Sequence, residues 1–116
     1  MINTRTHGII DYATGALLLV APYLFGFATG GIEQWLPQVI GAMIIVMSLF
    51  TDYELSISKA IPLRVHLGMD MVSGALLALS PWLFGFAGLI WWPHLLVGLM
   101  EIVVPLMTRR TPVRGL

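Results

Sequence analysis

Four long apolar segments follow one another along the chain, and short polar stretches separate them. Each segment approaches the roughly 20 residues that an α-helix needs to cross a hydrocarbon core of about 30 Å. Lipid offers no partner to unpaired backbone groups, so a helix is the form expected for spans of this kind. The hydrophobic pattern therefore predicts four transmembrane helices, over residues 7–27, 34–51, 65–86 and 89–108.

The first and third segments contain one sequence pattern twice, at a distance of 59 residues. The copy from His7 reads HGIIDYATGALLLVAPYLFGFA and the copy from His66 reads HLGMDMVSGALLALSPWLFGFA, with 12 of 22 positions identical. The second and fourth segments match more weakly at an offset of 57, where Gly41 and Thr51 align with Gly98 and Thr108. Self-similarity at a fixed offset indicates one structural unit used twice.

The expected fold class is therefore an all-α membrane protein whose four helices form two tandem helical hairpins. One membrane domain covers residues 1–116, with repeat 1 at about 5–53, a cytoplasmic loop at about 54–63 and repeat 2 at about 64–110. Two spans bring the chain back to its starting side, so the copies are parallel repeats. Their pseudo-two-fold axis is expected along the membrane normal.

Composition supports a lipid environment. Hydrophobic residues make up 58% of the chain and charged residues 10%, whereas a soluble domain has about 25% charged residues. Six basic residues balance six acidic ones, so no net charge attracts nucleic acid. The absence of cysteine excludes disulfides and thiolate metal sites.

The basic residues predict the orientation. All six lie before the first span, between the second and third spans, or after the fourth, and they are Arg5, Lys59, Arg64, Arg109, Arg110 and Arg114. The positive-inside rule then places both termini and the central loop in the cytoplasm. The tryptophans gather at the opposite ends of the spans, as an aromatic belt would, and they are Trp35, Trp82, Trp91 and Trp92.

A proline lies near the end of the first helix in each unit. Pro22 and Pro81 cannot donate a backbone hydrogen bond, so a kink is expected there, and Ser80 is expected to satisfy part of the freed backbone. A kink that fits the bundle is favoured over a broken helix that lines a site. The residues of this helix-kink motif are Pro22, Tyr23, Ser80, Pro81 and Trp82.

Ser80-Pro81-Trp82, inside the first helix of a two-helix membrane unit, resembles the signature of the SPW-repeat family of small integral membrane proteins. The first copy departs from the signature, since it reads Ala21-Pro22-Tyr23. The resemblance covers both hairpins. It implies a multi-pass protein of the bacterial cytoplasmic (inner) membrane and leaves the activity open.

Paired ionisable residues are the candidate chemistry. His7 and Asp11 lie one helical turn apart, and so do His66 and Asp70, with Arg5 and Arg64 just upstream. A charged carboxylate in a bilayer costs about 2.5–3.5 kcal/mol on insertion scales, so such groups face inward and find partners. One helical stripe contains His7, Asp11, Gly15 and Leu18, and its copy contains His66, Asp70, Gly74 and Leu77. The two stripes are expected to face each other, with Asp11 near His66 or Arg64 and Asp70 near His7 or Arg5. This predicts an intramembrane polar cluster of Arg5, His7, Asp11, Arg64, His66 and Asp70.

Interhelical clamping is the favoured role of this cluster. Two His and two Asp could also supply four metal ligands, but no completing motif supports the assignment, so no metal is assigned. Bis-histidine haem ligation by His7 and His66 is a further alternative, and a proton or ion path is another. No cofactor and no catalytic residue is assigned.

The fourth segment has a second polar face, formed by His94 and Glu101. Ile44 occupies the place equivalent to Glu101, so this carboxyl breaks the internal symmetry. A protonated carboxyl packed against a neighbour and a functional carboxyl are equally compatible with the position.

The favoured function is that of a non-catalytic structural, assembly or accessory subunit that acts through lateral helix contacts. It would work in the lipid bilayer as a homo-oligomer or within a larger membrane complex. The first alternative is a small proton, ion or solute carrier that uses the intramembrane carboxylates. The second is a haem- or quinone-binding redox subunit.

Overall fold

The computed structural model describes residues 2–51, 56–58 and 60–108 of the chain. Four α-helices account for most of them and no strand occurs there, apart from two isolated bridges. The helices are α1 (Thr4–Leu24), α2 (Ile32–Phe50), α3 (Leu63–Leu83) and α4 (Trp92–Met107). The all-α four-helix architecture expected from the hydrophobic pattern is confirmed.

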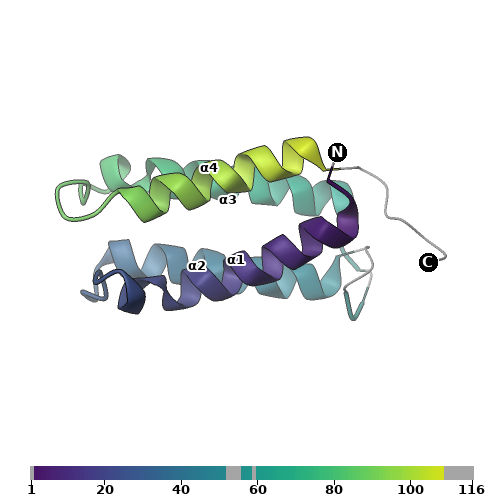
Figure 1. Cartoon of the computed structure of the whole chain (residues 1–116), viewed down its shortest axis with the longest axis horizontal. Helices are drawn as coiled ribbons and strands as arrows, with labels where there is room; N and C mark the ends of the chain where they lie inside the picture. The colour runs from purple at the N-terminus through teal and green to yellow at the C-terminus, as the bar shows by residue number, and fades with distance from the viewer. Residues whose placement is uncertain (1, 52–55, 59, 109–116) are drawn as a thin grey trace.

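The helices pair as two hairpins, α1 with α2 and α3 with α4 (Figure 1). Both hairpin turns lie at one end of an elongated molecule of 48 × 22 × 20 Å, and the described residues between α2 and α3, 56–58 and 60–62, lie at the other end. Packing is much denser within each hairpin than between the hairpins. The internal repeat is therefore a repeated helical hairpin.

Glycine pairs bring the two helices of each hairpin together. A Cβ on Gly41 would lie 2.8 Å from the carbonyl oxygen of Gly15, and one on Gly98 would lie 2.5 Å from that of Gly74. Only glycine allows the helix backbones to approach so closely. Gly15 and Gly74 thus pack inside their own hairpins, although they share a sequence stripe with the residues expected to face the other hairpin.

The two hairpins meet through side chains and two short backbone contacts. Leu18, Ile40, Ile44 and Leu77 form the buried apolar core between them. The backbone N–H of Ile2 donates to Met107 O at 2.8 Å, and that of Ile61 donates to Phe50 O at 2.7 Å. Residues 2 and 61 are 59 positions apart, as the sequence copies are, so these contacts follow the same pseudo-two-fold relation.

The repeated Leu-Phe-Gly-Phe sequence ends α1 and α3. Gly26 and Gly85 have φ values of 75° and 74°, a conformation that favours glycine. The N–H of Phe27 donates to Pro22 O at 2.9 Å, and the N–H of Phe86 donates to Pro81 O at 2.8 Å. This is the hydrogen bond of a Schellman C-cap. The helices therefore end at Leu24 and Leu83, before the ends predicted at residues 27 and 86.

Both prolines lie in the last turn of their helices, so they loosen the helix end and not the middle of a span. The Ser80 hydroxyl donates to Leu77 O at 2.7 Å. In a regular helix the N–H of residue 81 would donate to this carbonyl, but Pro81 has no N–H. This confirms the role expected for Ser80. The motif therefore combines a serine-satisfied turn with a glycine cap.

Within the described residues, α2 is the one helix long and apolar enough to cross a membrane, and α4 is apolar but has 16 residues. Polar residues lower the mean hydropathy of α1 and α3. Most of these polar residues are buried, including His7, Asp11, His66 and Asp70. The sequence average therefore hides how apolar the outer faces of these two helices are.

Candidate functional site

Four buried side chains of α1 and α3 converge on one point between the hairpins. His7 and Asp11 come from α1, and His66 and Asp70 from α3; we call them the His–Asp quartet. Helical periodicity puts the members of each pair on one face, one turn apart. All four are at most 1% exposed. The convergence expected across the repeat axis is confirmed by the contacts.

Each imidazole of the quartet contacts both carboxylates. His7 Nε2 lies 2.9 Å from Asp11 Oδ2 and 3.0 Å from Asp70 Oδ2. His66 Nε2 lies 2.5 Å from Asp11 Oδ2 and 3.2 Å from Asp70 Oδ2. The two rings meet edge to face with centroids 5.6 Å apart. Two nitrogens and two oxygens thus form a closed ring that joins the hairpins.

Two threonines hold the outer nitrogens of the imidazoles. His7 Nδ1 lies 2.9 Å from Thr108 Oγ1, and His66 Nδ1 lies 2.6 Å from Thr51 Oγ1. Each threonine is the C-cap residue of the second helix in the opposite hairpin. The prediction of site residues missed them. Their alignment in the two repeats was the signal that could have identified them.

The threonine contacts define the histidine tautomers. The hydroxyls of Thr51 and Thr108 donate to Met47 O and Val104 O, both at 2.6 Å. A hydroxyl has one proton, so each Oγ1 can only accept from the neighbouring Nδ1–H. Each Nε2 is therefore left to face the carboxylates, either as a second N–H donor or with its lone pair.

The arginines do not belong to the buried cluster. Arg5 and Arg64 are exposed in the first turns of α1 and α3, so their inclusion in the predicted cluster is wrong. An arginine needs solvent or an anionic partner, and the carboxylates already have the two imidazoles. The remaining basic residues, Lys59, Arg109, Arg110 and Arg114, lie outside the described residues.

Not every buried polar atom near the quartet has a partner. The Oδ1 atoms of Asp11 and Asp70 are buried without a hydrogen bond among the described residues, and so is Glu101 Oε2. Glu101 packs beside Gly74 on α3 and interacts electrostatically with all four quartet residues. Acceptor oxygens therefore remain available around the quartet.

His94, the other residue of the predicted second polar face, lies at a different level of the bundle. Its Nε2–H donates to Glu33 O at 2.9 Å, which links α4 to the first turn of α2. The rings of Phe27 and Phe86 flank it, with centroids 5.0 and 4.9 Å from the imidazole. His94 and Glu101 are two turns apart, so they do not form one site.

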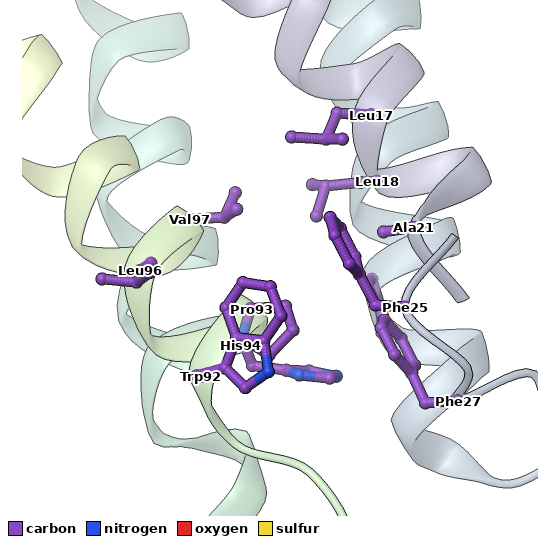
Figure 2. Close-up of a pocket in the computed structure, with 11 residues that line it drawn as sticks. Leu17, Leu18, Ala21, Phe25, Phe27, Trp92, Pro93, His94, Leu96 and Val97 are labelled. Carbon is purple, nitrogen blue, oxygen red and sulfur yellow. The ribbon is translucent and has the colours of Figure 1, made fainter. Parts of the chain in front are cut away.

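A cavity of about 120 Å³ lies beside His94, between α1 and α4. Figure 2 shows Leu17, Leu18 and Ala21 on one wall, opposite Trp92 and Val97 on α4. Its accessible wall is apolar, and the buried Nδ1 of His94 beside it has no hydrogen-bond partner among the described residues. The cavity is therefore an apolar recess near the hairpin turns, at the opposite end of the bundle from the quartet.

The quartet does not suit haem. A porphyrin plane ligated by His7 and His66 would lie between the two Nε2 atoms. The Oδ2 atoms of Asp11 and Asp70 already lie within 3.2 Å of both nitrogens. The geometry therefore favours a hydrogen-bonded cluster or a small cation over a macrocycle.

The tryptophans and Tyr23 lie far from the quartet. Trp35, Trp82, Trp91 and Trp92 are at the helix ends next to the hairpin turns, where their side chains are exposed. Tyr23 and Trp82 occupy equivalent places after the prolines, and both are exposed. Of the signature tripeptide, Ser80 and Pro81 are buried and act on the helix end, while Trp82 faces outward.

Comparison with known proteins identifies one relationship. The family model described as SPW repeat domain matches residues 5–108, which include both hairpins and the whole quartet. Neither the search of curated proteins nor the search of solved structures finds a match. Since the family model covers most of the chain, the protein belongs to the SPW repeat family.

Proposed function

We propose that this protein is a non-catalytic, four-span protein of the bacterial cytoplasmic membrane that acts as a structural or accessory subunit. Membership in the SPW repeat family suggests a small membrane protein. The observation that carries the proposal is the distribution of side chains over the helices. From the second turn of each helix onward, every exposed residue is apolar or aromatic.

The interior shows the opposite pattern. Six ionisable side chains are buried inside the bundle: His7, Asp11, His66, Asp70, His94 and Glu101. A water-soluble bundle of this size would expose most of its ionisable groups and bury its large apolar ones. Buried polar groups beneath an apolar outer surface suit lipid as the surrounding solvent.

The proposed orientation places the quartet end of the bundle toward the cytoplasm. Arg5 and Arg64 lie at that end, and the exposed tryptophans lie at the other. The chain contains no cysteine, so single-cysteine variants give an unambiguous readout. Gly88→Cys, in the hairpin turn between α3 and α4, is expected to react with a membrane-impermeable maleimide in intact spheroplasts. Ser58→Cys, between α2 and α3, should react only after lysis. Labelling of Ser58→Cys in intact spheroplasts would overturn the orientation.

Lateral contact is the interaction that this surface offers. The hairpin turns are short, and beyond the first turn of each helix the exposed side chains are apolar or aromatic. Protein extracted with its surrounding lipid is expected to have a mass of more than one chain, or to carry a second membrane protein in fixed ratio. A single chain with no partner at native expression would contradict the accessory role.

A proton or ion path is the second candidate, and Glu101 is the observation that favours it. Its Oε2 has no partner among the described residues, and it interacts with the charges of the whole quartet. Three carboxylates thus lie near one another inside the bundle. Ion flux in reconstituted vesicles that depends on Glu101 would favour this function over the structural one.

A further inference from the structure

We propose that the His–Asp quartet is a binding site for one divalent first-row transition metal ion, with Zn²⁺ as the best fit. This goes beyond the proposed structural role and does not depend on membrane placement, because all four ligands come from within one chain. The ligand atoms would be Nε2 of His7 and His66 and Oδ2 of Asp11 and Asp70.

The four atoms already have almost the separation that a metal requires. They all lie within 4.8 Å of one another, and their nitrogen–oxygen contacts range from 2.5 to 3.2 Å. Metal–ligand distances of about 2.0–2.2 Å put neighbouring ligands of a tetrahedron about 3.3–3.5 Å apart. An ion would therefore need the four nitrogen–oxygen contacts to open by up to about 1 Å, and any separation near the 4.8 Å limit to close by about 1.3–1.5 Å.

The groups behind the ligands are those that orient metal-binding imidazoles. A metal-ligating histidine usually donates its other ring N–H to a fixed acceptor, which sets the tautomer. Thr108 and Thr51 accept from Nδ1–H of His7 and His66, and their own protons are committed to backbone carbonyls. In the neutral form of each imidazole, this leaves the Nε2 lone pair directed at the centre of the quartet.

The charge and the spare oxygens also match a divalent ion. Two carboxylates with two neutral imidazoles carry a charge of −2, which one divalent cation neutralises in a buried site. The Oδ1 atoms of Asp11 and Asp70 have no hydrogen bond among the described residues that would break when the carboxylates turn toward an ion. Two nitrogens with carboxylate oxygens favour Zn²⁺, Co²⁺ or Fe²⁺ over Mg²⁺ and Ca²⁺, which prefer all-oxygen sites.

Titration of the purified, chelator-treated full chain with Co²⁺ tests the proposal. We expect one Co²⁺ per chain, intense visible absorption typical of a four-coordinate site, and displacement by Zn²⁺. Wild-type protein that stays folded and shows no saturable spectrum would overturn the proposal and would leave membrane placement untouched. Binding by His66→Gln with an unchanged spectrum would also overturn it.

Thr108→Val is the milder variant, because it keeps the side-chain shape and all four ligands. Loss of an outer-shell partner is expected to weaken Co²⁺ binding by about 10- to 100-fold. His94→Gln is the matched control: it removes the third histidine, which lies outside the quartet, and should keep wild-type affinity. Equal affinities of Thr108→Val and wild type, or lost binding in His94→Gln, would place the metal elsewhere and refute the proposed site.

Discussion

Asp11→Asn is expected to lower the free energy of unfolding by about 3–5 kcal/mol, since removal of one partner from a buried ion pair leaves the other stranded. Asp11 Oδ2 contacts the Nε2 atoms of both His66 and His7, one on each hairpin. An amide cannot replace an anionic acceptor between two imidazoles. Typical domains have only about 5–15 kcal/mol of total stability, so the loss is large. Denaturant titration of the detergent-solubilised protein with a chelator present measures it.

Asp70→Asn should cause a similar loss, because Asp70 makes the equivalent contacts across the pseudo-two-fold axis. The double variant should lose less than the sum of the two single variants, since both act on one network. Ser80→Ala is the control, because its hydroxyl is also buried and hydrogen-bonded but lies at the opposite end of the bundle. If Asp11→Asn cost no more than Ser80→Ala, the quartet would not clamp the hairpins.

Val72→Arg is expected to prevent most of the protein from inserting into the membrane. Val72 lies near the middle of α3, and its side chain is 69% exposed. An arginine at the centre of a span costs about 2.5–3.5 kcal/mol on insertion scales, or about 70- to 400-fold in the insertion equilibrium. The polar residues already in α3 leave little hydropathy to offset this. The membrane-integrated fraction after carbonate extraction gives the result.

Thr6→Arg serves as the matched control. Thr6 is also exposed, but it lies in the first turn of α1, where an arginine can reach the interface. It should insert as the wild type does. In a water-soluble bundle both substitutions would be surface changes worth less than about 0.5 kcal/mol. Equal behaviour of Val72→Arg and Thr6→Arg would therefore refute the lipid-facing assignment of α3.

Local sequence determined the elements and their duplication. Apolar segments with a 59-residue repeat predicted four helices in two hairpins. The one-turn spacing of His7 and Asp11 put both on one face, because helical periodicity is a property of the segment alone. Gly26 and Gly85 ended their helices where a left-handed residue is needed. The position of each helix, and the set of residues on one of its faces, follow from the local sequence alone.

The relations between helices were decided only by the tertiary structure. The stripes predicted to face each other are divided: His7 and Asp11 meet the other hairpin, while Gly15 packs against Gly41 in its own hairpin. A helix stripe is wide enough to contact two neighbours, and periodicity does not say which residue meets which helix.

The composition of the site also depended on the tertiary structure. Thr51 and Thr108 reach His66 and His7 only because the end of each second helix lies beside the start of the opposite hairpin. Arg5 and Arg64 neighbour the histidines in sequence, yet helical rotation directs them outward. The sequence determined that each histidine and its aspartate lie one helical turn apart. The docking of two hairpins created the closed quartet, because contacts between residues 55 to 63 positions apart form only when the hairpins pack together.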